Sequence, residues 1–167
     1  MYKLFLFIEN LNRYINNQLK IIYWKLKYGK RISIGKNLRF RKGLIINISK
    51  DGCLKIGNNN FFNNYCSINC HKYINIGDNN LFGENAKIYD HNHIFNNLNI
   101  DMMKEFYCHE IIIGNNNWIG SGSIILSKTE LGNHNVIGAG VVLNEKYENG
   151  MMVRKEKQFE EKINFKY

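Results

Sequence analysis

A six-residue repeat in residues 113–143 constrains the fold of this chain more than any other feature. An aliphatic residue returns at every sixth position, and glycine follows four of the six. The six residues are Ile113, Ile119, Ile125, Leu131, Ile137 and Leu143. A period of six matches neither the 3.6 residues of an α-helical turn nor the two-residue period of a strand. The repeat therefore predicts a parallel β-helix, in which the chain turns a corner after each hexapeptide.

The same repeat, less regular, extends toward the N-terminus. Three hexapeptides make one coil, and the pattern resumes after short insertions at 52–55 and 74–75. We predict an all-β protein of about five coils, over residues 34–51, 56–73, 76–93, 113–130 and 131–148. Such a prism is narrow, and three copies side by side would bury far more surface. The expected assembly is therefore a homotrimer.

Residues 3–28 read as an amphipathic helix. Aliphatic residues recur there at spacings of three and four, which places them on one face. They are Leu4, Ile8, Leu11, Ile15, Leu19, Ile22 and Leu26. Residues 1–42 hold eleven Lys or Arg against one acidic residue, Glu9, a net charge of +10, whereas the whole chain carries +9. The apolar face has two interpretations: contact with an anionic membrane or lipid-linked substrate, or a cap on the first coil or a neighbouring subunit.

One long insertion, residues 94–112, interrupts the ladder. A loop of this length is generally functional or disordered, and its apolar content argues against disorder. We expect it to protrude from the prism and to lie against a neighbouring subunit. The predicted organisation is an N-terminal helix at 1–30, a β-helix domain at 31–148, and a tail at 149–167 that contains a short C-terminal helix.

The composition fits one globular domain. The 167 residues are 44% hydrophobic and 22% charged, and Asn and Gly, which tolerate left-handed backbone, suit a fold with many tight corners. The four cysteines form no Cys-x-x-Cys pair, and no apolar run near the start is long enough for a signal peptide or a membrane span. We therefore expect free thiols and a cytoplasmic protein, with peripheral membrane contact through residues 3–28 as one alternative.

Two histidines stand just before the long insertion, in the sequence Asp90-His91-Asn92-His93. Residues two apart in an extended chain point to the same side. An imidazole with a carboxylate partner is suited to taking a proton from a hydroxyl group. The segment is the candidate catalytic site, and a polar, turn-forming outer strand is the alternative interpretation.

Other chemistries lack their motifs. Cys66, Cys70 and His71 have no clear fourth ligand at the usual spacing, so no metal is expected. Neither a Gly-x-Ser-x-Gly elbow nor a phosphate-binding glycine loop occurs. Net charge without an aromatic and basic binding motif does not indicate nucleic-acid binding.

Three features together resemble the left-handed β-helix acetyltransferases: the hexapeptide ladder, the segment 90–93 before a protruding loop, and the sequence IGNNNWIGS at 113–121. Within them, the chain is most similar to the branch of maltose and galactoside acetyltransferases and bacterial capsule or O-antigen O-acetyltransferases. The resemblance covers about residues 31–148. It implies left-handed coils, a trimer with active sites between subunits, and acetyl-CoA as the donor.

The resemblance also assigns a catalytic histidine by position. That residue follows an aliphatic corner by five positions, which from Ile88 is His93, and His91 is the next candidate. Asp90, or Asp101 in the loop, would hold the imidazole in one tautomer.

Donor and acceptor residues follow from the same resemblance. Trp118 would wall the acceptor site, with packing at a corner as the alternative. The donor groove would be lined by Ser121, Gly138, Ala139 and Asn144. The family's usual closing segment for CoA is replaced here by MMVRKEKQ at 151–158, where Arg154, Lys155 or Lys157 would have to meet the nucleotide phosphates.

The expected function is transfer of an acetyl group from acetyl-CoA to a sugar hydroxyl of a bacterial surface polysaccharide or its precursor. Two alternatives stay open. One is N-acetylation of a nucleotide-linked amino sugar, and the other is a non-enzymatic β-helix that serves as a scaffold or binding module.

Overall fold

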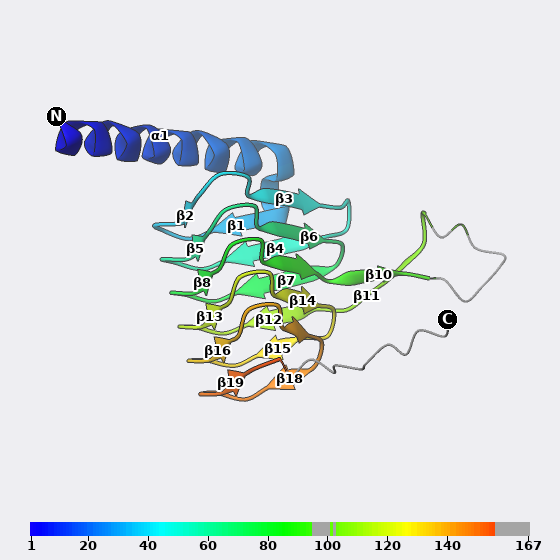
Figure 1. Cartoon of the computed structure of the whole chain (residues 1–167). Coiled ribbons are helices and arrows are strands. Elements are labelled where there is room, and N and C mark those ends of the chain that lie inside the picture. The colour runs from blue at the N-terminus through cyan, green and yellow to red at the C-terminus, as the bar shows by residue number, and fades with distance from the viewer. Residues whose placement is uncertain (95–100, 102, 156–167) are drawn as a thin grey trace, which may run out of the picture.

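The computed structural model describes residues 1–94, 101 and 103–155. A long helix, α1 (Tyr2–Tyr28), lies across one end of a three-sided prism of short parallel strands, and the 3-10 turn Gly29–Arg31 joins the two (Figure 1). Sheet A is formed by β1 (Ile32–Ile34), β4 (Cys53–Ile56), β7 (Tyr73–Ile76), β12 (Ile111–Ile113), β15 (Glu130–Leu131) and β18 (Lys146–Tyr147).

The other two sides of the prism have the same construction. Sheet B is formed by β2 (Arg39–Phe40), β5 (Phe61–Phe62), β8 (Leu81–Phe82), β13 (Trp118–Ile119), β16 (Val136–Ile137) and β19 (Met152–Val153). Sheet C is formed by β3 (Ile45–Ile48), β6 (Ser67–Cys70), β9 (Lys87–Tyr89), β14 (Ile124–Leu126) and β17 (Val142–Leu143). The three edges of the prism are named AB, BC and CA after the sheets that meet there.

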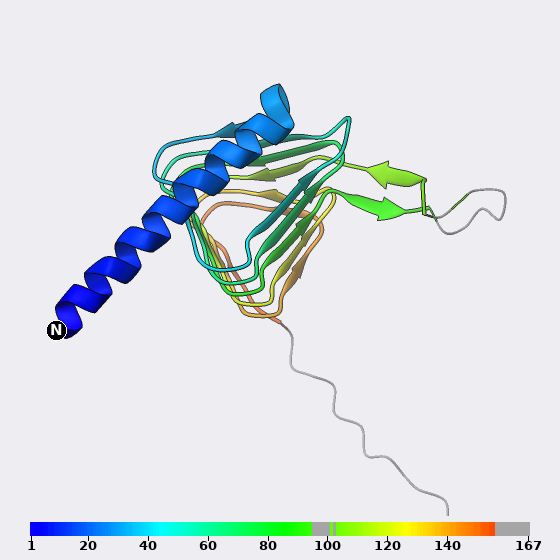
Figure 2. The same ribbon diagram turned by 90° about the horizontal axis from the view of Figure 1, so that it is seen from above.

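The coils are left-handed. Seen from the α1 end, the chain passes anticlockwise from sheet A through sheet B to sheet C while it moves away from the viewer (Figure 2). The prediction of a β-helix with an N-terminal helix is confirmed, including the handedness.

Stacked aliphatic and aromatic side chains fill the interior. Each corner residue of the repeat points inward and lies directly over its counterpart in the next coil; Ile68, Ile88, Ile125 and Leu143 form one such column in sheet C. All four are at most 1% exposed. In sheet B, Phe62 and Phe82 stack with ring centroids 4.3 Å apart. The hexapeptide period thus produces three apolar columns that close a continuous core.

Left-handed backbone at the edges explains the abundance of Asn. Residues at equivalent positions of the AB edge have φ between 57° and 59°, a region that Asn tolerates better than most residues. They are Asn37, Asn59, Asn79, Asn116 and His134. Asn side chains also cross between coils, since the Asn115 carboxamide oxygen accepts from the Asp78 backbone N–H at 2.7 Å.

The structure contains six coils, one more than the five predicted ranges. The sixth consists of β18 and β19 within the described residues. This coil lies partly in the predicted tail, and residues 152–153 form a strand where the C-terminal helix was expected to begin. That part of the prediction is wrong because Met152 and Val153 pair with β16 in sheet B. The remainder of the predicted helix, from residue 156 onward, lies outside the described residues.

All variation in coil length is confined to the CA edge. Successive partners in sheet A are 22, 20, 37, 18 and 16 positions apart, from Ile32–Leu54 to Glu130–Lys146. The steps from sheet A to B and from B to C stay constant. The predicted insertions at 52–55 and 74–75 overlap β4 and β7, so the extra residues come slightly earlier, in the turns before these strands.

The long insertion leaves the prism at this CA edge as a β-hairpin. Strands β10 (His91–His93) and β11 (Phe106–Cys108) pair antiparallel and project away from the sheets (Figures 1 and 2). We call the segment 91–108 the arm. The predicted protrusion is present, but its base is regular, since His91 pairs with Cys108 and His93 with Phe106.

Helix α1 covers the first coil with a polar and aromatic face. Several carbonyl groups of the first coil face α1, which provides donors for three of them: Asn17 Nδ2 to Phe40 O at 3.0 Å, Lys20 Nζ to Leu44 O at 2.6 Å, and Tyr28 Oη to Ile46 O at 2.8 Å. These bonds satisfy an otherwise open sheet end.

The predicted aliphatic stripe is therefore not the face that caps the coil. Leu4, Leu11, Leu19 and Leu26 are 45–80% exposed, whereas Trp24 on the opposite face is 2% exposed. No helix in the described part of the chain is both long and apolar enough to cross a bilayer.

Candidate active site

The arm is anchored by one buried carboxylate, Asp90. This side chain is fully buried at the point where the chain turns from β9 into β10. Its Oδ1 accepts from the His71 backbone N–H at 2.7 Å, and its Oδ2 accepts from the Lys72 backbone N–H at 2.8 Å. Because charge-assisted bonds of this kind are strong, Asp90 fixes the arm to the preceding coil.

The same carboxylate holds His91. Its Nδ1 lies 3.2 Å from Asp90 Oδ1, which favours the tautomer with the proton on Nδ1 and leaves Nε2 as the acceptor. One face of the His91 ring stacks on His71, with centroids 3.7 Å apart, and Phe106 of β11 meets the pair edge-on. The His91 ring is thus enclosed on several sides.

His93 lies further out along the same strand. Its ring packs against Phe106 with centroids 4.6 Å apart, and the residue is exposed to solvent. The predicted pairing of Asp90 with the His93 imidazole is not found, because the carboxylate turns inward to His71, Lys72 and His91. The structure therefore gives the two histidines different settings: His91 is oriented and enclosed, and His93 is presented to solvent.

His71 is also a part of this site, although the sequence alone did not indicate it. Ile68 pairs with Ile88, so residues 20 positions apart lie over one another, and His71 falls over His91. A spacing of 20 residues also separates the Ile-Gly pairs at 56–57 and 76–77, and this signal in the sequence could have placed His71 over His91.

The surroundings of Asp90 shift the pKa values of three neighbouring groups. Burial is the main cause that lowers the pKa of His71 below its usual 6.5, and the adjacent His91 adds to this effect. Burial and the nearby Asp90 carboxylate raise the pKa of the Cys108 thiol, and the same two causes raise the pKa of Cys70 strongly. Neither cysteine is suited to act as a thiolate nucleophile near neutral pH.

Asp90→Asn is expected to destabilise the protein by about 2 kcal/mol, because an amide nitrogen would face a backbone donor in a buried position. Urea unfolding measures the change. Asp51→Asn is the matched control: Asp51 is exposed at the same edge two coils earlier, so its effect should stay within about 0.5 kcal/mol. Equal stabilities of the two variants would show that the buried contacts of Asp90 contribute little.

The stability of the protein is expected to fall as the pH drops below about 6.5. The folded-state pKa of His71 lies below the unfolded value, so the unfolded chain binds a proton more readily in that range. His71→Phe keeps an aromatic ring in the stack and removes the titration. Unfolding free energies measured between about pH 7.5 and 5.5 should depend less on pH in this variant. An unchanged slope would contradict the assignment.

Three of the four predicted donor residues lie together at the BC edge. The backbone N–H of Gly140 donates to Ser121 O at 2.9 Å, which places Ala139 directly beneath Ser121 in the next coil. A Cβ built on Gly120 would come within 2.6 Å of the Ala139 nitrogen, so this close approach requires glycine. Gly138 lies beneath Gly120 in the same column. A Cβ built on Gly138 would lie 3.7 Å from the Cα of Arg154.

The fourth, Asn144, lies at the CA edge beneath the arm. Leu126 pairs with Tyr89, and Leu143 at the end of β17 pairs with Ile125, so Asn144 follows below Leu126. The outer face of sheet C therefore runs from the base of the arm to the corner that holds Ser121 and Ala139. Ile124 and Val142 pair on that face, and Val142 is 50% exposed. This apolar pair lies between the two predicted parts of the site.

Trp118 lies apart from the histidines within one chain. It is 55% exposed on sheet B, near the AB edge, in an exposed apolar column with Leu81 and Met152. The arm leaves from the CA edge, so a single subunit does not bring Trp118 to His93.

No group of three or more His, Cys, Asp or Glu residues suited to a metal ion is found among residues 1–94, 101 and 103–155. Of the cations considered for the nucleotide phosphates, Arg154 and Lys155 are exposed beyond β19, and Lys157 lies outside the described residues. Two cavities of about 830 and 670 Å³ lie along α1, away from the arm.

Known proteins share this architecture. A hexapeptide-repeat acetyltransferase of Vibrio cholerae O1 biovar eltor, complexed with acetyl-CoA, superimposes with a TM-score of 0.64 and 23% identity over 71% of this chain. An N-acyltransferase of Bacillus cereus, AntD, in complex with dTDP and CoA, gives a TM-score of 0.61 at 21% identity over 71% of this chain and 66% of its own. At these identities the likeness establishes the fold.

A galactoside acetyltransferase in complex with CoA is 30% identical, with a TM-score of 0.57, over 64% of this chain. The chain spans 63% of the Vibrio cholerae protein and 52% of the galactoside acetyltransferase. A comparison with curated protein sequences gave no match. Residues 110–145, which contain β12 to β17, match the family described as bacterial transferase hexapeptide (six repeats).

Proposed function

We propose that the protein is an O-acetyltransferase that moves an acetyl group from acetyl-CoA to a sugar hydroxyl of a bacterial surface polysaccharide, such as a capsule or O-antigen, or its precursor. The observation that carries the proposal is the position of the histidine pair. It lies on an arm that leaves the prism where the outer face of sheet C ends. The hexapeptide match at 110–145 and the CoA complexes of the similar structures support the donor.

The outer face of sheet C would hold the donor. The apolar pair of Ile124 and Val142 suits the pantetheine chain. Asn144, near the arm, would form hydrogen bonds with the amide groups of pantetheine. Arg154, which follows β19 beneath the corner with Ser121 and Ala139, would meet the nucleotide phosphates.

His93 would act as the general base. Its exposed imidazole takes the proton from the sugar hydroxyl, and the hydroxyl oxygen attacks the thioester carbonyl. A backbone N–H stabilises the oxyanion. The carbon–sulfur bond then breaks, and the proton on His93 passes to the departing CoA sulfur. Asp90, His91 and His71 hold β10 in place, so that His93 keeps its position relative to the donor.

A homotrimer would complete the acceptor site. Within one subunit, Trp118 lies near the AB edge and His93 at the CA edge, and packing three prisms side by side brings such edges together. The exposed apolar column of Leu81, Trp118 and Met152 gives this contact a physical reason. Four free cysteines and a donor made in the cytosol favour a cytoplasmic location.

Two measurements test the function. Addition of CoA should raise the melting temperature, since a ligand that binds only the folded state stabilises it. Release of free CoA thiol from acetyl-CoA, assayed across a panel of sugars and oligosaccharides, should then identify an acceptor. Neither response would be seen with a non-enzymatic scaffold, and that result would overturn the proposal.

The nature of the acceptor atom is tested on the product. An acetyl ester is released by mild base, whereas an acetamide is not. The N-acyltransferase of Bacillus cereus bound to dTDP shares this fold, so an amino sugar on a nucleotide is the second candidate acceptor. A base-stable product would replace the first candidate with the second.

A further inference from the structure

Helix α1 exposes an apolar surface that no element of the described chain covers. Its residues at the contact with the prism are Asn17, Ile21, Trp24 and Tyr28. The aliphatic stripe lies on the other side, and each of its members is 43–80% exposed: Leu4, Ile8, Leu11, Ile15, Leu19, Ile22 and Leu26. A continuous apolar stripe of this length on a water-exposed helix marks an interaction surface.

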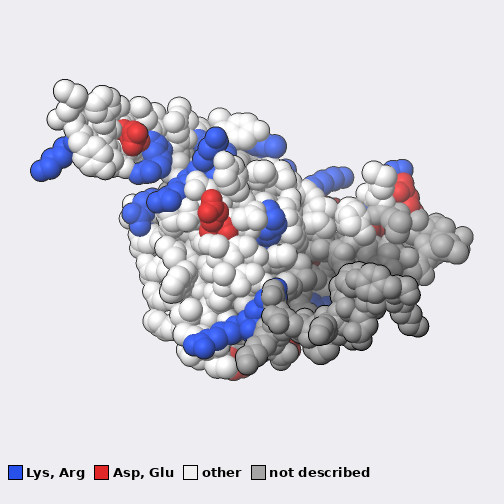
Figure 3. Space-filling view, viewed as in Figure 1, with Lys and Arg blue, Asp and Glu red and all other residues white. Residues whose placement is uncertain are grey.

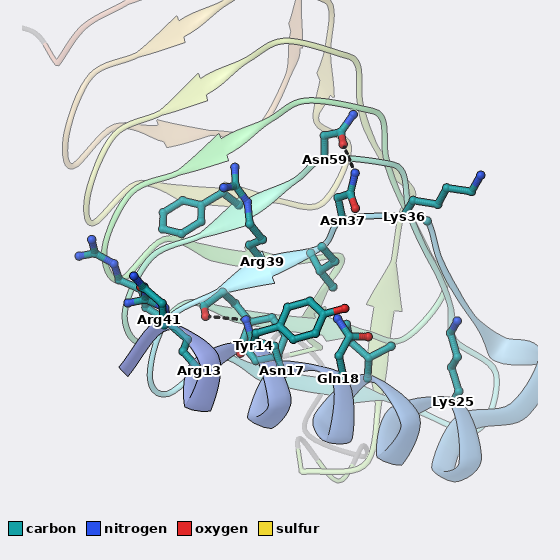
Figure 4. A pocket seen from close by; sticks show the side chains of 16 residues that line it. Arg13, Tyr14, Asn17, Gln18, Lys25, Lys36, Asn37, Arg39, Arg41 and Asn59 are labelled. Carbon is teal, nitrogen blue, oxygen red and sulfur yellow. Dashed lines mark hydrogen bonds between the residues drawn. The ribbon is translucent and has the colours of Figure 1, made fainter. Parts of the chain in front are cut away.

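A basic cavity adjoins this stripe. The larger of the two cavities, about 830 Å³, lies between α1 and the first two coils, and its lining contains five cationic side chains and no acidic one (Figure 4). These cations are Arg13, Lys25, Lys36, Arg39 and Arg41. None of them takes part in an ion pair among the described residues. Lys and Arg side chains gather where α1 meets the prism (Figure 3).

The stripe and the cavity border each other on the helix. Gln18 and Lys25 line the cavity. Ile22 of the stripe lies four positions after Gln18 and three positions before Lys25. Residues at these spacings are neighbours on a helix surface. One ligand surface could therefore contact both, provided that it offers apolar chains beside anionic groups.

The charge of this region selects among the possible partners. A second copy would bring another segment with a net charge of +10 against the first, and the two would repel. An anionic phospholipid layer offers acyl chains for the stripe and phosphates for the cations, and basic amphipathic helices bind such layers in the interface plane. The pattern on α1 has this form.

We propose that α1 and the basic cavity together bind an anionic phospholipid surface, with the stripe in the acyl boundary and the cavity cations on the headgroup phosphates. This site is independent of the proposed transferase chemistry, since it involves no residue of the arm. It would hold the enzyme at a membrane face, with the N-terminal end of the prism toward the lipid.

The test is co-sedimentation of the full chain with vesicles of phosphatidylcholine alone or mixed with phosphatidylglycerol. The protein is expected to bind the mixed vesicles and to bind vesicles of phosphatidylcholine alone more weakly. Binding to the mixed vesicles should decrease as the salt concentration is raised. Ile15→Glu combined with Leu19→Glu should reduce binding at least tenfold, since two charges replace two apolar contacts. Asn16→Glu is the matched control for the introduced charge on the same helix.

The contribution of the cavity is tested separately. Arg39→Gln with Arg41→Gln should weaken vesicle binding by about fivefold for each lost cation. Lys55→Gln with Lys146→Gln removes the same charge elsewhere on the prism and should change binding less. Leu26→Gln, at a side chain that is 80% exposed, is a second stripe variant that leaves the folded core untouched. Melting temperatures confirm that each variant is folded.

Three outcomes would overturn the proposal. The first is equal binding by the stripe variants and the wild type. The second is a change of oligomeric state in the stripe variants, seen by analytical ultracentrifugation, without loss of vesicle binding, which would make the stripe a subunit interface. The third is binding of inorganic diphosphate, lost in the Arg39 and Arg41 variant, by a protein that does not bind vesicles. That result would assign the cavity to a soluble phosphate.

Discussion

His93→Asn is expected to lower acetyl transfer by about a hundred- to ten-thousand-fold, the usual contribution of a general base. The thermal shift with CoA and the melting temperature should stay close to those of the wild type, because His93 is exposed and lies apart from the proposed donor face. A loss confined to the rate of transfer would identify a group that acts on the acceptor proton. The measurement is CoA thiol release at saturating donor and acceptor.

His134→Asn is the matched control for this variant. His134 is an exposed histidine at the AB edge with φ of 59°, a conformation that Asn tolerates, so folding should be kept. Its activity should remain that of the wild type. His91→Asn should lose less activity than His93→Asn, because His91 positions the arm through Asp90 and His71. If instead the His91 variant is inactive and the His93 variant is active, the general base is His91.

Phe82→Ala is expected to destabilise the protein by about 3–5 kcal/mol. The Phe82 side chain is fully buried and stacks on Phe62 with nearly parallel rings, 6° apart, so truncation leaves a cavity in the middle of the sheet B column. Such a loss is a large share of the total stability of a typical domain, about 5–15 kcal/mol. Chemical denaturation at a fixed protein concentration measures it.

Leu81→Ala provides the comparison for this core variant. Leu81 precedes Phe82 in β8 but points outward and is 43% exposed. Its truncation should cost about 1 kcal/mol or less. A small effect of Phe82→Ala, equal to that of Leu81→Ala, would mean that the column repacks and that its stacking does not hold the coils together.

The sequence was sufficient for the regular part of this fold. Corner residues such as Ile68, Ile88 and Ile125 repeat with a period that only a β-helix accommodates, and they all lie in one buried column. The sixth coil escaped prediction because Tyr147 stands where the pattern has an aliphatic residue and follows Leu143 by four positions in place of six. Its pairing with β15 depends on register, which a local pattern does not show.

The candidate site was only partly accessible from sequence. Asp90, His91 and His93 stand out as neighbours in the chain, but the partner of Asp90 is decided by the turn that buries its carboxylate. His71 comes from the previous coil, so it is recognised only when coil lengths are known. The stripe on α1 was also visible, but a helical period does not reveal which face meets the protein; here Asn17 and Trp24 do.

The confinement of length variation to the CA edge has a consequence for engineering. The spacing between paired residues of sheet A varies from 16 to 37 positions. The coils nevertheless keep the same register in all three sheets, because every additional residue is inserted at the CA edge. The arm 91–108 can therefore be exchanged for the hairpin of another hexapeptide protein without shifting the AB and BC corners. Chimaeras made in this way would vary the proposed acceptor side of the molecule while the proposed donor face stays constant.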